Sequence, residues 1–207
     1  MTEHITVNEQ SSVRIEAERV LYFDPFHIGG EPRDADIILI THEHFDHFSP
    51  KDIAAVSKDD TVIIAPKAMA NAGFPKSRAV FMAPGEVTEI LGIRIEAVPA
   101  YNLLKPFHPK RNGWLGYVAD IGGERVYVCG DTDDTPEARN VKCDIVCVPI
   151  GDTYTMNAKK AAVFVNELSP RAAIPIHYGT IVGKPSDEEE FERNVESSIR
   201  VIKKIRF

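Results

Sequence analysis

Three histidines and an aspartate stand close together in the first quarter of the chain, at His42, His44, Asp46 and His47. They follow the apolar run 37–40, whose β-branched residues and leucine are typical of a strand covered on both faces. Neutral imidazole and carboxylate bind zinc, manganese or iron, and four such donors within six residues cannot all reach one tetrahedral ion. The spacing therefore predicts a metal centre that holds two ions.

A solvated turn rich in histidine is the alternative interpretation of this motif, and it would be sufficient for a lone His-x-His. Asp46 and His47 argue against it, because they extend the cluster directly after a buried strand. The carboxyl ends of strands are the usual location of an α/β active site. We therefore interpret the motif as functional.

The pattern H-x-H-x-D-H, preceded by Thr41, resembles the signature of the metallo-β-lactamase superfamily. Three further segments stand in the order that this superfamily uses: Asp24-Pro25-Phe26, Gly130-Asp131-Thr132 and Pro175-Ile176-His177-Tyr178-Gly179. The resemblance covers about residues 13–183. It is closest to small stand-alone metal-dependent hydrolases, the branch that contains ascorbate-6-phosphate lactonase-like and, more distantly, N-acylphosphatidylethanolamine phospholipase D-like proteins. It implies a fold and a chemistry but no substrate.

The resemblance also implies how the ligands divide between two ions. The first two histidines of the motif and a third histidine hold one ion, Asp46, His47 and His177 hold the other, and Asp131 bridges both. A hydroxide held between the ions would attack the substrate, with Asp46 orienting it and the second ion stabilising the oxyanion or leaving group. By residue preference alone, Asp131 is equally a turn aspartate, and Asp24 is equally a turn residue or a partner of the ligands.

The third histidine of the first ion is where the chain departs from the superfamily pattern. Relatives commonly place it directly after the strand that here ends at Tyr101, where this chain has Asn102. An asparagine carbonyl binds zinc more weakly than imidazole does and favours manganese or iron. We therefore assign His108, six residues later, as the ligand and Asn102 to the substrate pocket. The alternative is that His108 is a surface histidine in a basic loop.

Residues 101–114 form the most irregular segment, because prolines and a glycine interrupt any periodicity. Structured loops of this length are commonly active-site lids. Its basic residues either form a solvated turn or provide a cationic patch for a substrate phosphate or carboxylate. We expect the substrate to contact residues of this loop and of the loops after two later strands: Tyr101, Asn102, Lys105, Trp114, Tyr154 and Tyr178.

Strands alternate with helices along the chain, in two halves that resemble each other weakly. Residues 35–40 and 143–148 are both apolar runs that lead into a polar loop. The alternation predicts an α/β sandwich of two packed sheets with helices outside. The resemblance makes this the four-layer αββα metallo-β-lactamase fold with two mixed sheets.

Local signals mark several boundaries between elements. Ser49 followed by proline predicts a helix start directly after the metal motif. Hairpins are expected over 87–98 and 115–129, and a short helix over 66–72.

Composition restricts the remaining classes. A chain of 207 residues that is 43% hydrophobic can bury one sizeable core, so we predict a single domain over 1–207. The net charge of −7 disfavours nucleic acid as a partner. Three cysteines without C-x-x-C spacing and a start without a signal-peptide pattern predict a reduced, cytoplasmic protein. No apolar stretch approaches the roughly 20 residues of a membrane span.

We therefore predict a metal-dependent hydrolase with two divalent ions, zinc in preference to manganese or iron. Its substrate would be a small, anionic molecule with an ester, lactone, amide or phosphodiester bond. One alternative is an iron-dependent oxidoreductase on the same ligands, and another is a metal-binding regulator without turnover. The sequence indicates neither the substrate nor the oligomeric state.

Overall fold

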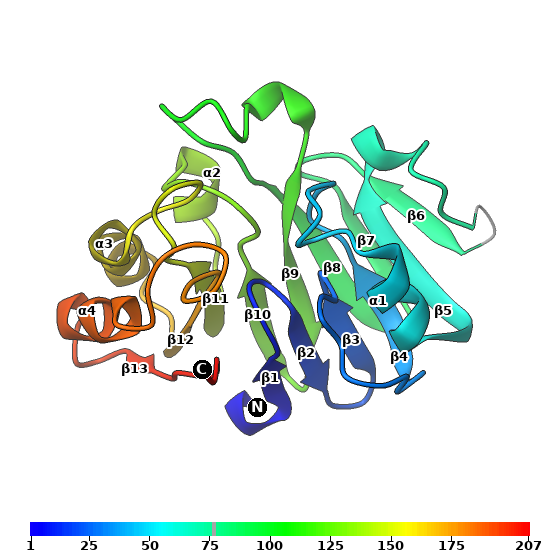
Figure 1. Ribbon diagram of the computed structural model, residues 1–207, viewed down its shortest axis with the longest axis horizontal. Helices are drawn as coiled ribbons and strands as arrows, with labels where there is room; N and C mark the ends of the chain where they lie inside the picture. The colour runs from blue at the N-terminus through cyan, green and yellow to red at the C-terminus, as the bar shows by residue number, and fades with distance from the viewer. Residues whose placement is uncertain (76–77) are drawn as a thin grey trace.

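Two mixed β-sheets lie face to face in the computed structural model, which describes residues 1–75 and 78–207 (Figure 1). The first sheet contains, in spatial order, β1 (Ile5–Val7), β2 (Val13–Glu16), β3 (Val20–Phe23), β4 (Ala35–Leu39), β5 (Ser57–Pro66) and β6 (Ala79–Met82). The second contains β13 (Arg200–Val201), β12 (Ala172–Ile176), β11 (Ile145–Pro149), β10 (Glu124–Val128), β9 (Leu115–Ile121), β8 (Ile93–Pro99) and β7 (Val87–Ile90).

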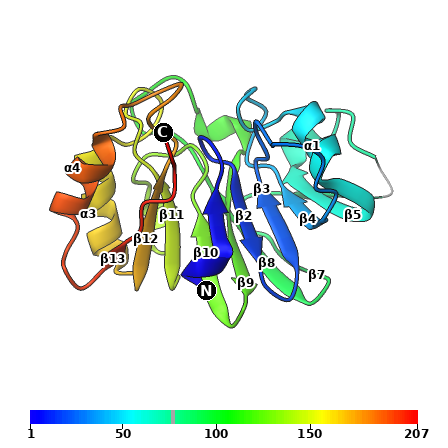
Figure 2. The same cartoon turned by 60° about the horizontal axis from the view of Figure 1, so that its bottom comes forward.

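Helices cover the outer faces of both sheets. Figures 1 and 2 show α1 beside β4 and β5, and α3 and α4 beside β11 to β13 at the other side of the molecule. The α-helices are α1 (Pro50–Val56), α2 (Pro136–Arg139), α3 (Ala158–Leu168) and α4 (Asp187–Asn194). Short 3-10 helices are η1 (Thr2–His4), η2 (Lys67–Met69) and η3 (Lys110–Asn112). The predicted four-layer αββα sandwich is therefore confirmed. Within the part of the chain that the structure describes, no helix has the length and apolarity needed to cross a membrane.

Strand β4 is buried on both faces, as its continuous apolar run predicts. Ile37 and Leu39 belong to the core between the two sheets. Ile38 belongs to a second apolar cluster, which includes Ile53 and Val56 of α1. β4 pairs in parallel with β3 and β5, so the metal motif leaves the sheet from a central strand.

Helix α1 begins where the sequence predicts it. The Ser49 hydroxyl accepts a hydrogen bond from the backbone N–H of Asp52, at 3.3 Å, and Pro50 takes the first helical position. The Asp52 carboxylate in turn accepts a hydrogen bond from the backbone N–H of Ile28, at 2.8 Å. The second contact holds the start of α1 against the loop between β3 and β4.

The segments with candidate ligands all leave one end of the sandwich. The strands β10, β11 and β12 run parallel to one another, and Asp131 and His177 follow β10 and β12 closely. The loop between β8 and β9 carries His108. Because the carboxyl ends of parallel strands meet at one edge of a sheet, residues distant in sequence are brought together there.

One local expectation needs correction, although both predicted hairpins form. The helix expected over 66–72 is only the 3-10 helix η2, because β5 extends to Pro66. β5 also begins earlier than its apolar pattern indicates, since Ser57 pairs with Ala35 and the Thr61 hydroxyl donates a hydrogen bond to the carbonyl of Ala35, at 2.6 Å.

Candidate metal centre

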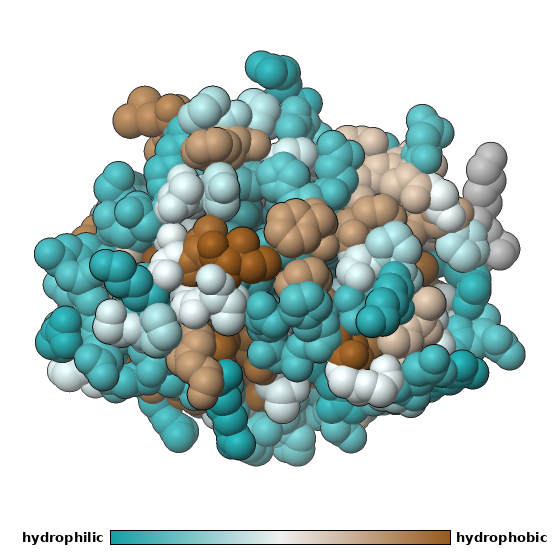
Figure 3. Space-filling model, in the orientation of Figure 1, coloured by the Kyte–Doolittle hydropathy of each residue, from teal (hydrophilic) through white to brown (hydrophobic). Residues whose placement is uncertain are grey.

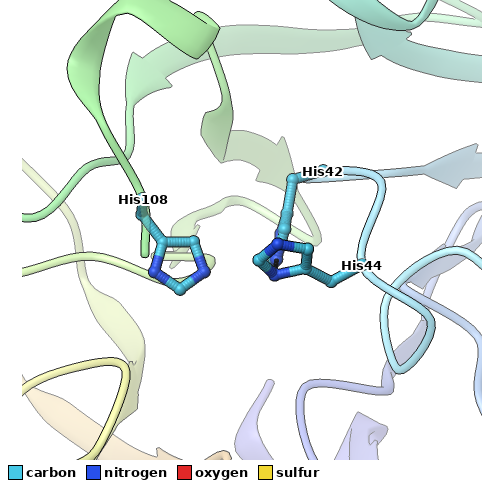
Figure 4. Close-up of side chains that lie close together, drawn as sticks. All are labelled: His42, His44 and His108. Carbon is cyan, nitrogen blue, oxygen red and sulfur yellow. Dashed lines mark hydrogen bonds between the residues drawn. The ribbon is translucent and has the colours of Figure 1, made fainter. Parts of the chain in front are cut away.

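One group of candidate ligands consists of His42, His44 and His108, whose ring nitrogens converge. Nε2 of His42 lies 3.0 Å from Nδ1 of His44. Figure 4 shows His108 facing this pair from the loop on the opposite side. The Trp114 ring lies against all three imidazoles, with ring centroids 4.9–5.4 Å apart. The structure therefore brings the predicted third histidine to the first two.

Asn102 holds His108 from behind. Its Oδ1 accepts hydrogen bonds from the backbone N–H of His108, at 3.1 Å, and from the ring Nδ1, at 3.0 Å. Its Nδ2 donates to the carbonyl of Tyr154, at 2.9 Å. Because Nδ1 carries the proton, Nε2 of His108 faces the other histidines with a free lone pair. Asn102 thus contacts a candidate ligand, and it does not line the pocket to which we assigned it.

A second group of candidate ligands consists of Asp46, His47 and His177, and Asp131 lies between the two groups. Nε2 of His177 is 3.4 Å from Oδ2 of Asp46 and 3.3 Å from Oδ2 of Asp131. Asp131 also lies 3.4 Å from Nε2 of His47 and 3.3 Å from Nε2 of His108. Its central position is the one expected of a bridging carboxylate.

Asp24 orients His47. Its Oδ2 accepts a hydrogen bond from the ring Nδ1 of His47, at 2.7 Å, and both residues are fully buried. The same carboxylate accepts hydrogen bonds from the backbone N–H of Thr41, at 2.7 Å, and from its hydroxyl, at 2.6 Å. A carboxylate behind a histidine fixes the tautomer and makes the other nitrogen a better ligand. The sequence left two roles open for Asp24, a turn residue or a partner of the ligands. Its hydrogen bond with His47 is the contact expected of a partner of a ligand.

His177 has an unusual backbone that the first hairpin supports. Its φ of 56° lies in the left-handed region, which non-glycine residues seldom adopt. The His177 N–H donates to the carbonyl of Gln10, at 2.9 Å, and the side-chain amide of Gln10 donates to the Thr180 hydroxyl, at 2.7 Å. Gln10 lies in the turn between β1 and β2, so the first sheet braces a loop of the second.

The buried polar atoms of the cluster fit metal ions. Nε2 of His47, Nε2 of His108, both ring nitrogens of His177 and Oδ1 of Asp131 are buried without a hydrogen-bond partner. The nitrogen-to-oxygen separations of 3.3–3.6 Å exceed those of ordinary hydrogen bonds. Two ligands on one tetrahedral zinc lie about 3.3 Å apart, given bond lengths of roughly 2.0–2.1 Å. The residues therefore fit the ions that the motif predicts.

The protonation of the histidines agrees with this fit. Burial lowers the pKa of His108 to about 4, and burial lowers the pKa of His42 well below its usual value. Both rings are therefore neutral at pH 7, as metal ligands must be. Burial also lowers the pKa of His47, but the carboxylates of Asp131 and Asp24 outweigh it and raise this pKa to about 9. The carboxylates thus favour positive charge at His47, and a metal ion bound there would replace the ring proton.

A pocket of about 340 Å³ opens onto residues of both groups and onto Asp131. It is lined by His44, Phe45, Asp46, Phe107, Asp131, Tyr154, His177 and Ile181. Of the six residues expected to contact substrate, only Tyr154 is among them. Phe45, Phe107 and Ile181 were missed, although Phe45 stands inside the motif and Ile181 follows His177 in its loop.

The other expected substrate residues have protein partners. The Lys105 ammonium donates to the carbonyls of Asp152 and Thr155. The hydroxyl of Tyr101 donates to the carboxylate of Glu137, at 2.8 Å. Two more aromatic side chains are buried, Trp114 against the three histidines and Tyr178 with its hydroxyl on Glu188.

Known proteins resemble the chain over nearly its whole length. A family model described as "Beta-lactamase superfamily domain" matches residues 4–177. A UPF0173 metal-dependent hydrolase of Methanosarcina barkeri is 32% identical over 94% of this chain and 91% of its own. A solved structure from Parabacteroides distasonis, described as that of a metal-dependent hydrolase, has a TM-score of 0.81 and 32% identity, covering 97% of this chain and 91% of its own. Igni18, a metallo hydrolase from Ignicoccus hospitalis, shares the fold with a TM-score of 0.78, at 20% identity over 98% of this chain and 95% of its own.

Proposed function

The chain belongs to the metallo-β-lactamase superfamily and is a metal-dependent hydrolase, and on this basis we propose that it cleaves a small molecule with two divalent ions. The observation that carries the proposal is the set of buried nitrogen and oxygen atoms without hydrogen-bond partners, which converge from four segments of the chain. Buried polar atoms in proteins usually have a hydrogen-bond partner, so the concentration of unpaired atoms at this one place supports bound ions.

The proposed ligands divide as the motif implies. His42, His44 and His108 would hold one ion, and Asp46, His47 and His177 would hold the other. Asp131 would bridge them, a role that its contacts with histidines of both groups support. Zinc suits the imidazole-rich first group, and the added carboxylates of the second group also suit manganese or iron.

Bound ions of this kind lower the pKa of a water molecule to about 7 and stabilise negative charge on the substrate. The protein's own contribution is orientation. Asp46 would accept a hydrogen bond from the attacking water and hold it toward the scissile bond. The neighbouring carboxylate of Asp24 keeps His47 in place through the hydrogen bond from its ring Nδ1.

A cysteine nucleophile is disfavoured. Cys129 and Cys147 are fully buried, and burial raises the pKa of Cys147 to about 12. Burial also raises the pKa of Cys143 to about 12. The thiolate is the nucleophilic form, so these thiols are unreactive near neutral pH.

The proposed bond types are ester, lactone, amide and phosphodiester, because each requires attack by water and stabilisation of an oxyanion. Any negative charge on the substrate would be met by the metal ions themselves. The nearby cations have other partners, since Lys105 binds backbone carbonyls and Lys110 pairs with Glu137, at 2.6 Å.

Metal analysis and turnover of one variant test the proposal. We expect two ions per chain under saturating zinc or manganese, and Asp46→Asn should lower hydrolysis of an ester, lactone and phosphodiester panel at least about a hundredfold. Asp60→Asn, at an exposed residue of β5, is the control. One ion per chain, or near-normal activity of Asp46→Asn, would contradict the assignment.

Iron with oxygen-dependent turnover would support the oxidoreductase, and retained metal without any turnover would support a regulator.

A further inference from the structure

The pocket beside the candidate metal centre has a polar floor and an apolar rim. His44, Asp46, Asp131 and His177 form the floor. The other four lining residues are large and apolar or aromatic, and none is a lysine or arginine: Phe45, Phe107, Tyr154 and Ile181. A pocket built for an anionic group would offer fixed cations away from the metals. This pocket offers hydrocarbon surface instead.

The rim residues are unusually exposed for their type. Phe45 is 68% exposed, Phe107 44%, Ile181 42% and Tyr154 36%. They come from four different loops, so their gathering at one pocket is not a consequence of one amphipathic segment. In the space-filling view, brown and tan side chains gather over the loops that follow β4 and β12 (Figure 3). An exposed apolar surface around a reactive site marks the place where a ligand is desolvated.

The aromatic wall is held in place before any ligand arrives. The rings of Phe107 and Tyr154 meet edge to face, with centroids 4.8 Å apart. Asn102 joins the two segments, because it binds the backbone N–H of His108 next to Phe107 and the carbonyl of Tyr154. Lys105 adds a second link through the carbonyls of Asp152 and Thr155. A preorganised wall costs little entropy when it binds a ligand.

We propose that this pocket selects substrates with an uncharged apolar group, alkyl or aromatic, next to the bond that is cleaved. Phe107 and Tyr154 form one wall for this group, and Phe45 and Ile181 complete the rim. The cavity volume of about 340 Å³ lies at the low end for ligand pockets, so the group is small. The inference rests on the proposed hydrolase function, and it adds the chemical class of the substrate.

Product-like carboxylates test this selection without depending on turnover. Dissociation constants of the metal-loaded protein are measured calorimetrically for acetate, hexanoate, phenylacetate and the dicarboxylate adipate. Hexanoate and phenylacetate should bind at least about tenfold more tightly than acetate, since burying a side-chain-sized apolar group contributes that much. Adipate should bind more weakly than hexanoate, because its second carboxylate would meet the apolar rim.

Variants of the rim locate the effect. Ile181→Ala and Phe107→Ala should each remove most of the advantage of phenylacetate over acetate, while metal content stays unchanged. Leu104→Ala is the matched control, because Leu104 is 97% exposed on the same loop as Phe107 and does not line this pocket. Ile181→Lys should invert the order and favour adipate.

Equal affinity for acetate and phenylacetate, undetectable binding of phenylacetate, or tighter binding of adipate by the unmodified protein would overturn the inference. Failure of the hydrolase proposal has a different signature. In that case the ester, lactone and phosphodiester panel is not turned over, yet phenylacetate still binds more tightly than acetate and Ile181→Ala removes the difference.

Discussion

The oxygen of Asn102 accepts two hydrogen bonds from the same residue, His108, one from its backbone and one from its ring. These two hydrogen bonds fix the orientation of the His108 ring, a candidate ligand that lies in the loop between β8 and β9. The sequence favours His108 over Asn102 as the ligand, because imidazole is the better zinc ligand, and this assignment stays a prediction. The hydrogen bonds between them could not be predicted from the sequence, because nothing periodic in the loop indicates that it folds back on itself.

Substitution of His108 should weaken metal binding more than substitution of Asn102. We expect His108→Ala to bind one ion fewer per chain, because it lacks a ligand. Asn102→Ala should still bind both ions, with affinity weakened about 10- to 100-fold, because the ring of His108 loses its orientation. Competition with a chromogenic chelator measures both. Full occupancy in His108→Ala together with metal loss in Asn102→Ala would instead identify Asn102 as the ligand.

Asp24 provides a second test of whether a residue that is not itself a ligand affects metal binding by orienting a histidine. Asp24→Asn should weaken metal affinity about 10- to 100-fold, because an amide is a poorer acceptor for the ring N–H of His47. Asp52→Asn is the matched control, since Asp52 is also buried and also accepts a backbone N–H, but at helix α1. Both variants should lose stability. Equal metal affinity in both would show that Asp24 has only a structural role.

At the scale of elements, strand β4 and helix α1 could be predicted closely. The run 37–40 is apolar without alternation, and Ser49 and Pro50 are a strong helix-start signal. The beginning of β5 could not be predicted, because its first four residues are polar and carry no apolar pattern. Among these four residues Ser57 pairs with Ala35 of β4, and the register then shifts so that Val62 is the next residue paired with β4, which is a tertiary effect.

The carboxylate of Asp36 ties β4 to its neighbours and gives a pH-dependent stability. It accepts hydrogen bonds from Lys58, at 2.6 Å, and from the backbone N–H of Val20, at 2.8 Å, and Arg19 lies 3.9 Å away. Burial raises the pKa of Asp36, but the Lys58 and Val20 hydrogen bonds and the nearby positive charges outweigh it and lower the pKa below its usual value.

The sign of the effect follows from this lowered pKa. The stabilisation is fully present above the usual aspartate pKa of about 3.9, and it is lost as pH falls through the lower folded value. Asp36→Asn should therefore unfold more easily by about 1 kcal/mol at pH 7, and this difference should shrink below about pH 4. Urea unfolding across pH measures it, with Asp60→Asn as control. A difference that does not change with pH would contradict the role of the charge.

At the scale of the whole molecule, the candidate ligands join the two sheets. His42, His44, Asp46 and His47 leave the first sheet, whereas Asp131 and His177 leave the second. The layers could be predicted from the alternation of elements and from the family resemblance. The pocket rim could not, because Phe107 and Ile181 lie in loops whose paths depend on distant contacts. The available signal for the rim was the presence of large apolar residues in the loops that carry the candidate ligands.

Metal removal should therefore destabilise the entire sandwich. At free metal about a thousand times Kd, each ion stabilises the folded state by about 4 kcal/mol. For a chain of this length that corresponds to a fall in Tm of roughly 10 °C for each ion removed. Thermal unfolding with and without chelator, followed by metal addition, measures the change. A Tm that does not respond to chelation would contradict a metal centre between the sheets.

The contact between Gln10 and His177 has a consequence for the order of synthesis. The first hairpin emerges from the ribosome early in translation. His177 emerges only after most of the chain has been synthesised. Until then the carbonyl of Gln10 lacks the partner that it has in the folded protein, and Asp46 and His47 lack the third member of their group. The group of Asp46, His47 and His177 is therefore incomplete until late in translation, and we expect that an ion held by this group would be loaded late in the maturation of the protein.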